Sequence, residues 1–119
     1  MRFYIASHYK NKELVVDLSK KLFAVGIGTT QTWPTMPGDT EIIKADVAAI
    51  DLSEIDAADG VIVLTENCER VSGGMHFEAG YGLGTGKAVL QVGPQVNIFY
   101  HLKNIRHFEA IEELLGYLS

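Results

Sequence analysis

The chain has 119 residues, 47% of them hydrophobic, and a formal net charge of −5 at pH 7. That length and apolar content suit a single folded domain over residues 1–119 and exclude an intrinsically disordered chain. No stretch approaches the ~18 apolar residues of a transmembrane helix, and no basic cluster is present. We therefore expect neither a membrane protein nor a partner of duplex nucleic acid.

The N-terminal residues Arg2 to Ser7 form a short apolar run, which predicts a strand directly after the first methionine. We therefore expect no signal peptide and a cytoplasmic protein. The single cysteine, Cys68, excludes an intrachain disulfide, and the four histidines lack the spacing of a metal-binding motif. We accordingly expect neither a bound metal nor another cofactor.

Helical and extended patterns alternate over the next part of the chain. Aliphatic residues at helical spacing predict a helix over residues 11–25, and the threonine-rich stretch 27–33 favours a second, edge-like strand. After a proline-rich loop, Asp39 or Thr40 is expected to cap a helix that continues to about Ala58. The apolar face expected for this helix consists of Ile43, Val47 and Ile50.

The second half begins with residues 60–65, an apolar run without alternation that predicts a central strand covered on both faces. A helix over 74–85, a strand over 88–92, a short strand over 105–108 and an amphipathic helix over 109–118 follow. Alternating strands and helices with right-handed crossovers predict a three-layer α/β/α sandwich. Its five-stranded parallel sheet is expected to have the order 2-1-3-4-5.

The glycine-rich segment before Lys87 matches neither of two common nucleotide-binding motifs. A Walker A loop requires a glycine where Tyr81 stands and a serine or threonine where Ala88 stands. The Gly-x-Gly-x-x-Gly fingerprint fits no register of these glycines and belongs after the first strand. Close packing of a helix on the sheet is the expected reason for some of them.

Three polar side chains converge on one crevice of the predicted fold. Tyr4 lies in the first strand, Asp51 in the helix before the third strand, and Glu78 near the start of the following helix. A pair of carboxyl groups, one ionised and one protonated, is the minimum apparatus for cleaving a glycosidic bond. The helix dipole favours an ionised Glu78, a second carboxyl can protonate the leaving group, and a tyrosine hydroxyl can hold the nucleophile.

Residues around this crevice are candidates for substrate binding. The Ser-Gly-Gly segment can bring backbone N–H groups to a phosphate, or cradle only a hydroxyl. For the two residues that end the first strand, ligand contact and a plain polar turn are equally expected. The histidine at the helix start either lines the pocket or caps the helix, and Trp33 either stacks on a base or packs under the proline loop. The candidates are Ser7, His8, Ser72, Gly73, Gly74 and His76.

The run Gly-Gly-x-x-x-Glu-x-Gly-Tyr-x-Leu-x-x-Gly-Lys at 73–87 resembles the signature of the nucleoside 2-deoxyribosyltransferase family, which includes the 2′-deoxynucleoside 5′-phosphate N-hydrolases. The Tyr-Ile-Ala-Ser start and the spacing from Asp51 to Asp59 resemble that family too. The resemblance covers nearly the whole chain and is most specific over 51–92. It implies a flavodoxin-like fold and an enzyme that breaks or exchanges the N-glycosidic bond of a (deoxy)nucleoside or nucleoside 5′-monophosphate.

By this resemblance, Glu78 is the nucleophile that forms a ribosyl-enzyme ester, Asp51 handles the base and its proton, and Tyr4 orients the nucleophile. Members of the family are commonly dimers or higher homo-oligomers that complete the site across an interface, and Asn97 is the candidate for that contribution. The chain departs from the family pattern at His76. It also lacks the extended C-terminal segment of typical transferases.

Hydrolysis by water and transfer to a second base both fit this resemblance. Two other functions stay open at this point. One is an NAD-type glycohydrolase, since the same carboxylate chemistry releases nicotinamide. The other is a non-catalytic nucleotide-binding module in which Glu78 contacts a ribose hydroxyl without reacting.

Overall fold

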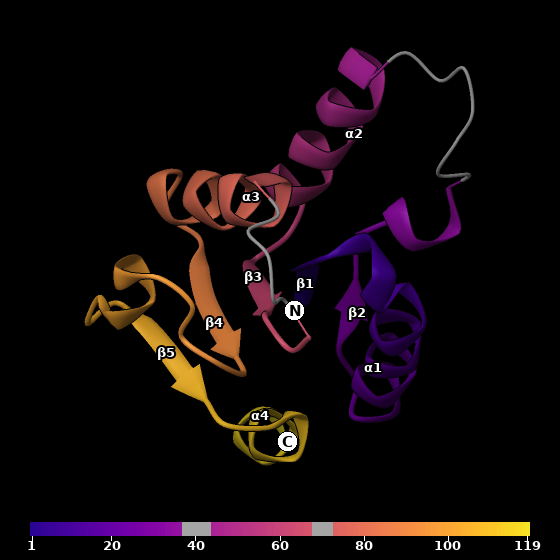
Figure 1. Cartoon of the computed structure of the whole chain (residues 1–119). Coiled ribbons are helices and arrows are strands. Elements are labelled where there is room, and N and C mark those ends of the chain that lie inside the picture. Colours follow the sequence, from indigo (N-terminus) through magenta and orange to yellow (C-terminus); the bar gives the residue numbers. More distant parts are fainter. Residues whose placement is uncertain (37–43, 68–72) are drawn as a thin grey trace.

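A five-stranded parallel sheet forms the centre of the computed structural model, which describes residues 1–36, 44–67 and 73–119 (Figure 1). In chain order the strands are β1 (Arg2–Ser7), β2 (Gly28–Thr29), β3 (Gly60–Leu64), β4 (Ala88–Val92) and β5 (Ile105–Phe108). In space the order is β2-β1-β3-β4-β5, and every neighbouring pair is parallel. The predicted strand order is confirmed.

Helices cover both faces of this sheet, so the predicted three-layer sandwich is confirmed (Figure 1). One face is covered by α2 (Lys44–Asp56) and α3 (Gly73–Gly84), and the other by α1 (Lys12–Ala24) and α4 (Ile111–Leu118). Three short 3-10 helices complete the described elements: η1 (Tyr9–Asn11), η2 (Trp33–Thr35) and η3 (Ile98–His101). No helix in the described ranges is long and apolar enough to span a bilayer.

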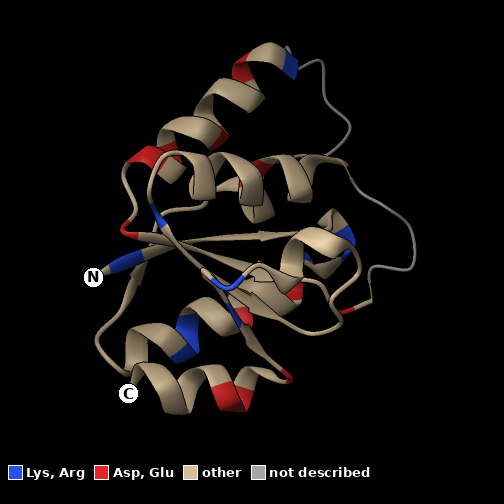
Figure 2. Cartoon of the chain, turned by 90° about the vertical axis from the view of Figure 1, so that its left-hand side faces the viewer, with Lys and Arg blue, Asp and Glu red and all other residues tan. Residues whose placement is uncertain are grey.

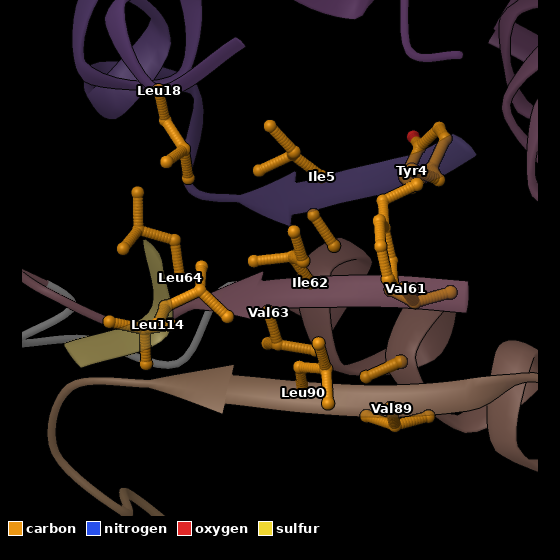
Figure 3. Packing of buried hydrophobic residues seen from close by; sticks show 14 of the residues in the cluster. Tyr4, Ile5, Leu18, Val61, Ile62, Val63, Leu64, Val89, Leu90 and Leu114 are labelled. Carbon is orange, nitrogen blue, oxygen red and sulfur yellow. The ribbon is translucent and has the colours of Figure 1, made fainter. Parts of the chain in front are cut away.

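The core lies between the central strands and their helices (Figure 3). All five residues of β3 are buried, as expected for an apolar strand between two neighbours. Ile62 and Leu64 lie near Leu18 of α1 and Leu114 of α4 (Figure 3). Burial of each such side chain contributes roughly 1.5–3 kcal/mol to stability. Packing of these apolar side chains therefore fixes β3 at the centre of the sheet, with β1 and β4 as its neighbours.

Strand register sets the direction of the tyrosine in β1. Tyr4 pairs with Val61, and a Cβ placed on Gly82 of α3 would meet Val61 Cγ2 at 2.6 Å. Tyr4 and Val61 therefore share the face that α3 covers. The same contact shows why one glycine of the glycine-rich helix is needed for close helix–sheet packing, as the sequence predicts. Gly80 and Gly84 have no such neighbour within 4 Å.

The predicted second strand over 27–33 is wrong beyond its first residues, because β2 contains only Gly28 and Thr29. After Thr29, side-chain hydrogen bonds to β1 take the place of the backbone hydrogen bonds of a strand. Gln31 Oε1 accepts a hydrogen bond from Ile5 N at 3.0 Å, and Trp33 Nε1 donates to Ile5 O at 2.8 Å. Trp33, the first residue of η2, is 9% exposed, so its ring belongs to the core.

The predicted helix from Asp39 or Thr40 to Ala58 is observed as α2, which ends at Asp56, while its predicted start lies outside the described residues. The expected apolar face is wrong at Ile50, which is 39% exposed; Ile55 is buried instead. The physical reason is that α2 packs on the body through its C-terminal turns, while its first turns extend past the sheet (Figure 1).

Candidate active site

Three side chains meet between the sheet and the helices α2 and α3. The hydroxyl of Tyr4, in β1, donates a hydrogen bond of 2.7 Å to Glu78 Oε2, in α3. Asp51, in α2, lies next to Glu78 and shares a side-chain hydrogen bond with it. The structure therefore brings together the three residues that the sequence predicts as a catalytic group.

Each of the three is fixed by the element that carries it. Tyr4 is fully buried by the alternation of β1, and Asp51 and Glu78 come from two helices that pack on one another. Acidic residues are spread along α2, whereas α3 carries Glu78 as its one charged residue (Figure 2). A carboxyl group in so apolar a helix, turned toward the sheet, is poorly hydrated.

The protonation of Glu78 differs from the expectation of an ionised nucleophile. Burial, reinforced by the charge and hydrogen bond of Asp51, raises the pKa of Glu78 to about 8, and the bond from Tyr4 offsets only part of this. The expectation relied on the helix dipole, whose effect is confined to the first turn, and Glu78 stands in the second turn of α3. Burial and the adjacent Asp51 therefore favour the protonated form of the unliganded Glu78.

Asp51 completes what we call the carboxyl pair, Asp51 and Glu78. Burial raises the pKa of Asp51, the hydrogen bond with Glu78 lowers it, and the charge of Glu54 raises it again. Two adjacent carboxyl groups resist double ionisation, so the pair holds one proton over a broad pH range. Asp51 Oδ1 is buried with no hydrogen-bond partner among the described residues.

Glu54 is a functional candidate that the sequence argument missed. Its carboxylate accepts hydrogen bonds from Thr32 N at 3.1 Å and from Thr32 Oγ1 at 2.7 Å. Sequence spacing could have identified Glu54, because a residue three positions after Asp51 on a helix lies on the same side as Asp51.

Two predicted substrate residues lie on the other side of α3 from Glu78. His76 Nδ1 is 2.6 Å from the hydroxyl of Tyr100, and Asn97 Nδ2 is 3.5 Å from the same nitrogen. They line a cavity of about 240 Å³ with Phe99 and other apolar residues. Side chains two positions apart on a helix point about 200° apart, so within one chain His76 and Glu78 face different spaces. Burial lowers the pKa of His76, which is therefore neutral at pH 7.

Ser7 and His8 make local hydrogen bonds at the end of β1. Ser7 Oγ donates to Leu64 O at 2.7 Å and accepts from Asn11 Nδ2 at 3.0 Å, while His8 Nδ1 accepts from Lys10 N at 3.1 Å. Ser7 also points to the opposite face of the sheet from Tyr4, because three positions separate them. The structure does not bring either residue to the carboxyl pair.

The Ser-Gly-Gly segment is described only in part. Ser72 lies outside the described residues, while Gly73 and Gly74 begin α3 and are exposed. Among the described residues, no atom beyond the chain neighbours and the helix backbone lies within 4 Å of where a Cβ would stand on either glycine. The described residues include no group of three His, Cys, Asp or Glu side chains suited to a metal ion.

No protein-family model matches the sequence, and a search of curated proteins gives no match. Solved structures do share the fold. A 2-deoxyribosyltransferase from Bacillus psychrosaccharolyticus matches with a TM-score of 0.74 at 22% identity, over 98% of this chain and 92% of that chain. CMP N-glycosidase BcmB from Clostridium botulinum matches with a TM-score of 0.68 at 17% identity, over 99% of this chain and 98% of that chain. The resemblance to 2-deoxyribosyltransferases is confirmed at the level of the flavodoxin-like fold.

Proposed function

We propose that this protein cleaves or exchanges the N-glycosidic bond of a (deoxy)nucleoside or nucleoside 5′-monophosphate. One observation carries the proposal: Glu78 is a partly buried carboxyl, held by the Tyr4 hydroxyl at 2.7 Å and paired with a second carboxyl, Asp51. Two adjacent carboxyl groups that share a proton supply both the nucleophile and the acid of a retaining glycosidase. The names of the two enzymes with the same fold agree with this chemistry.

In the proposed reaction, the proton of the pair resides on Asp51 when substrate is bound. Glu78 attacks the anomeric carbon, the C1′–N bond breaks, and its electrons go to the base, which takes the proton from Asp51. An ester between Glu78 and the sugar forms. Water or a second base then attacks C1′, the ester breaks, and Asp51 recovers a proton from the attacking group. Tyr4 holds Oε2, which leaves Oε1 of Glu78 to attack.

The 5′ group of the substrate is assigned to the start of α3. The N–H groups of Gly73 and Gly74 are among those that an α-helix leaves without an internal partner, and they favour an anion. With Ser72 they would hold a 5′-phosphate, or a 5′-hydroxyl by the same contacts. CMP N-glycosidase, by its name, acts on a nucleoside 5′-monophosphate, which supports testing both forms.

We also propose that the protein works as a homodimer or higher homo-oligomer. Ile98 is 77% exposed and Phe99 65%, and both follow Asn97 directly in η3, while Phe77 of α3 is 67% exposed. Clustered large apolar side chains on a surface mark a contact with another protein. A second copy on this surface would bring Asn97 near a partner's site.

The test is a panel of nucleosides and their 5′-monophosphates, with and without a second free base, followed by chromatography of the bases. Glu78→Ala runs beside the wild type, and Glu112→Ala, an exposed change on α4, serves as the control. Free base from wild type and control alone supports hydrolysis, and exchanged base supports transfer. Nicotinamide release from NAD⁺ would instead indicate the glycohydrolase. Binding without turnover by any substrate would overturn the catalytic proposal.

A further inference from the structure

Glu54 lies one helical turn after Asp51 on α2, on the flank of the carboxyl pair. Residues three positions apart on a helix are surface neighbours, with Cβ atoms about 5–6 Å apart. Both carboxylate oxygens of Glu54 accept a hydrogen bond from Thr32, one from its N–H and one from its hydroxyl. Two donors on two oxygens are the partners of an ionised carboxylate. Glu54 is thus a fixed negative charge beside the pair.

The Glu54 carboxylate is held in place because the segment that binds it, around Thr32, is itself hydrogen-bonded to the sheet. Thr30 Oγ1 donates to Glu54 O at 2.8 Å, which joins the same segment to the α2 backbone. Gln31 and Trp33, on either side of Thr32, bond to the backbone N–H and carbonyl of Ile5 in β1. An untethered glutamate at the edge of a helix would extend into water. This one is held toward β1, where Tyr4 lies.

Among the described residues, the groups named beside the carboxyl pair are acids or neutral donors. From β1 comes the Tyr4 hydroxyl, from α2 comes Glu54, and α3 adds no further charged residue. The ion pairs among the described residues, Lys21–Asp17 and His107–Glu109, lie elsewhere. Three carboxyl groups without a cation among their described neighbours favour the uptake of a proton. The Glu54 charge raises the pKa of both members of the pair.

We propose that Glu54 is a positioning residue whose tethered charge keeps the shared proton on the Asp51–Glu78 pair. The inference rests on the proposed function and adds a role to it. The pair needs one proton so that Asp51 can protonate the departing base while Glu78 attacks. By holding that proton, Glu54 extends activity to neutral and mildly alkaline pH without touching the substrate.

The test compares Glu54→Gln with Asp56→Asn. Glutamine keeps both contacts to Thr32, since its oxygen accepts from the N–H and its amide group donates to the hydroxyl, and only the charge is lost. Asp56→Asn removes the same charge from the same helix at a side chain that bonds to Tyr81 instead. We expect the alkaline limb of kcat/KM to move about 0.5–1 pH unit lower in Glu54→Gln and to stay in place in Asp56→Asn. A purely structural role would lower the melting temperature and leave the limb unchanged.

A second readout separates failure of this inference from failure of the proposed function. In unliganded protein labelled with ¹³C at glutamate side-chain carboxyls, the Glu78 signal, assigned by its loss in Glu78→Gln, should titrate at lower pH in Glu54→Gln. An active enzyme whose pH limb and Glu78 titration are unmoved by Glu54→Gln would overturn the inference and leave the proposed function intact. A protein without turnover, but with the lower titration pH, would keep the electrostatic role and overturn the proposed reaction.

Discussion

The Tyr4 hydroxyl is a neutral donor that holds Glu78, and its removal tests the nucleophile directly. In Tyr4→Phe, Glu78 loses the 2.7 Å bond to Oε2 and keeps its apolar surroundings. A hydrogen bond to a charged group contributes about 1.5–3 kcal/mol, so we expect kcat to fall roughly 10–100-fold with a smaller change in KM. Steady-state kinetics measure this, and Tyr117→Phe, on the exposed side of α4, is the control. An unchanged kcat would contradict the orienting role.

The protonation of Glu78 can be tested without any substrate. Its pKa is about 8 in the folded protein, above the ordinary value of 4.5 that applies to the unfolded chain. The unfolded state therefore releases the proton first, and the free energy of unfolding falls as pH rises from about 4.5 through 8, by at most roughly 1.4 kcal/mol per pH unit. Glu78→Gln cannot ionise. We expect the melting temperature of Glu78→Gln to rise relative to that of the wild type between pH 5 and pH 9. A difference that stays constant over this range would show that Glu78 titrates normally.

Among the elements, α3 depends on one close contact with the sheet. In Gly82→Ala the new Cβ would meet Val61 Cγ2 at 2.6 Å, so the helix must move away from β3. Overpacking of this kind costs about 1–3 kcal/mol, and we expect a melting temperature lower by several degrees. Gly84→Ala, with nothing within 4 Å, should cost nothing. Equal melting temperatures for both variants in thermal unfolding would contradict the contact.

Some elements of this fold are predictable from sequence and others are not. The apolar run Val61–Leu64 predicts β3 because a strand buried on both faces needs no alternation. The sequence overestimates β2 because Gln31 and Trp33 use side chains, not backbone, to bond to β1. Local sequence carries no signal for such contacts, which depend on a residue far away in the chain.

For the whole molecule, the proposed assembly predicts a concentration-independent oligomer in sedimentation experiments. Phe99→Asp places a charge in the apolar surface on α3 and η3 and should dissociate it, since desolvating an unpaired charge is costly. Phe23→Asp, at a phenylalanine of α1 that is 78% exposed, is the matched control. A wild type that sediments as a monomer at all concentrations would contradict the assembly.

The overall topology and the proximity of Tyr4, Asp51 and Glu78 are predictable from sequence, while the protonation of these groups is not. Alternating strands and helices constrain the strand order, and that order brings Tyr4, Asp51 and Glu78 together. Burial raises the pKa of Glu78, the Tyr4 hydrogen bond lowers it, and the neighbouring Asp51 and Glu54 raise it further, and none of these effects can be read from sequence spacing. From sequence spacing alone, His76 is predicted to lie beside the crevice. Spacing does not reveal which way the side chains of the first helical turn point. In the structure His76 lies against Tyr100 and Asn97 on the other side of α3.

The most direct test of the central claim is the mass of the protein quenched in acid during turnover of the best nucleoside or nucleotide. We predict a sugar adduct on the peptide that contains Glu78 in the wild type, and neither adduct nor base release in Glu78→Ala. Base release at the wild-type rate by Glu78→Ala, with no adduct in either protein, would contradict the account.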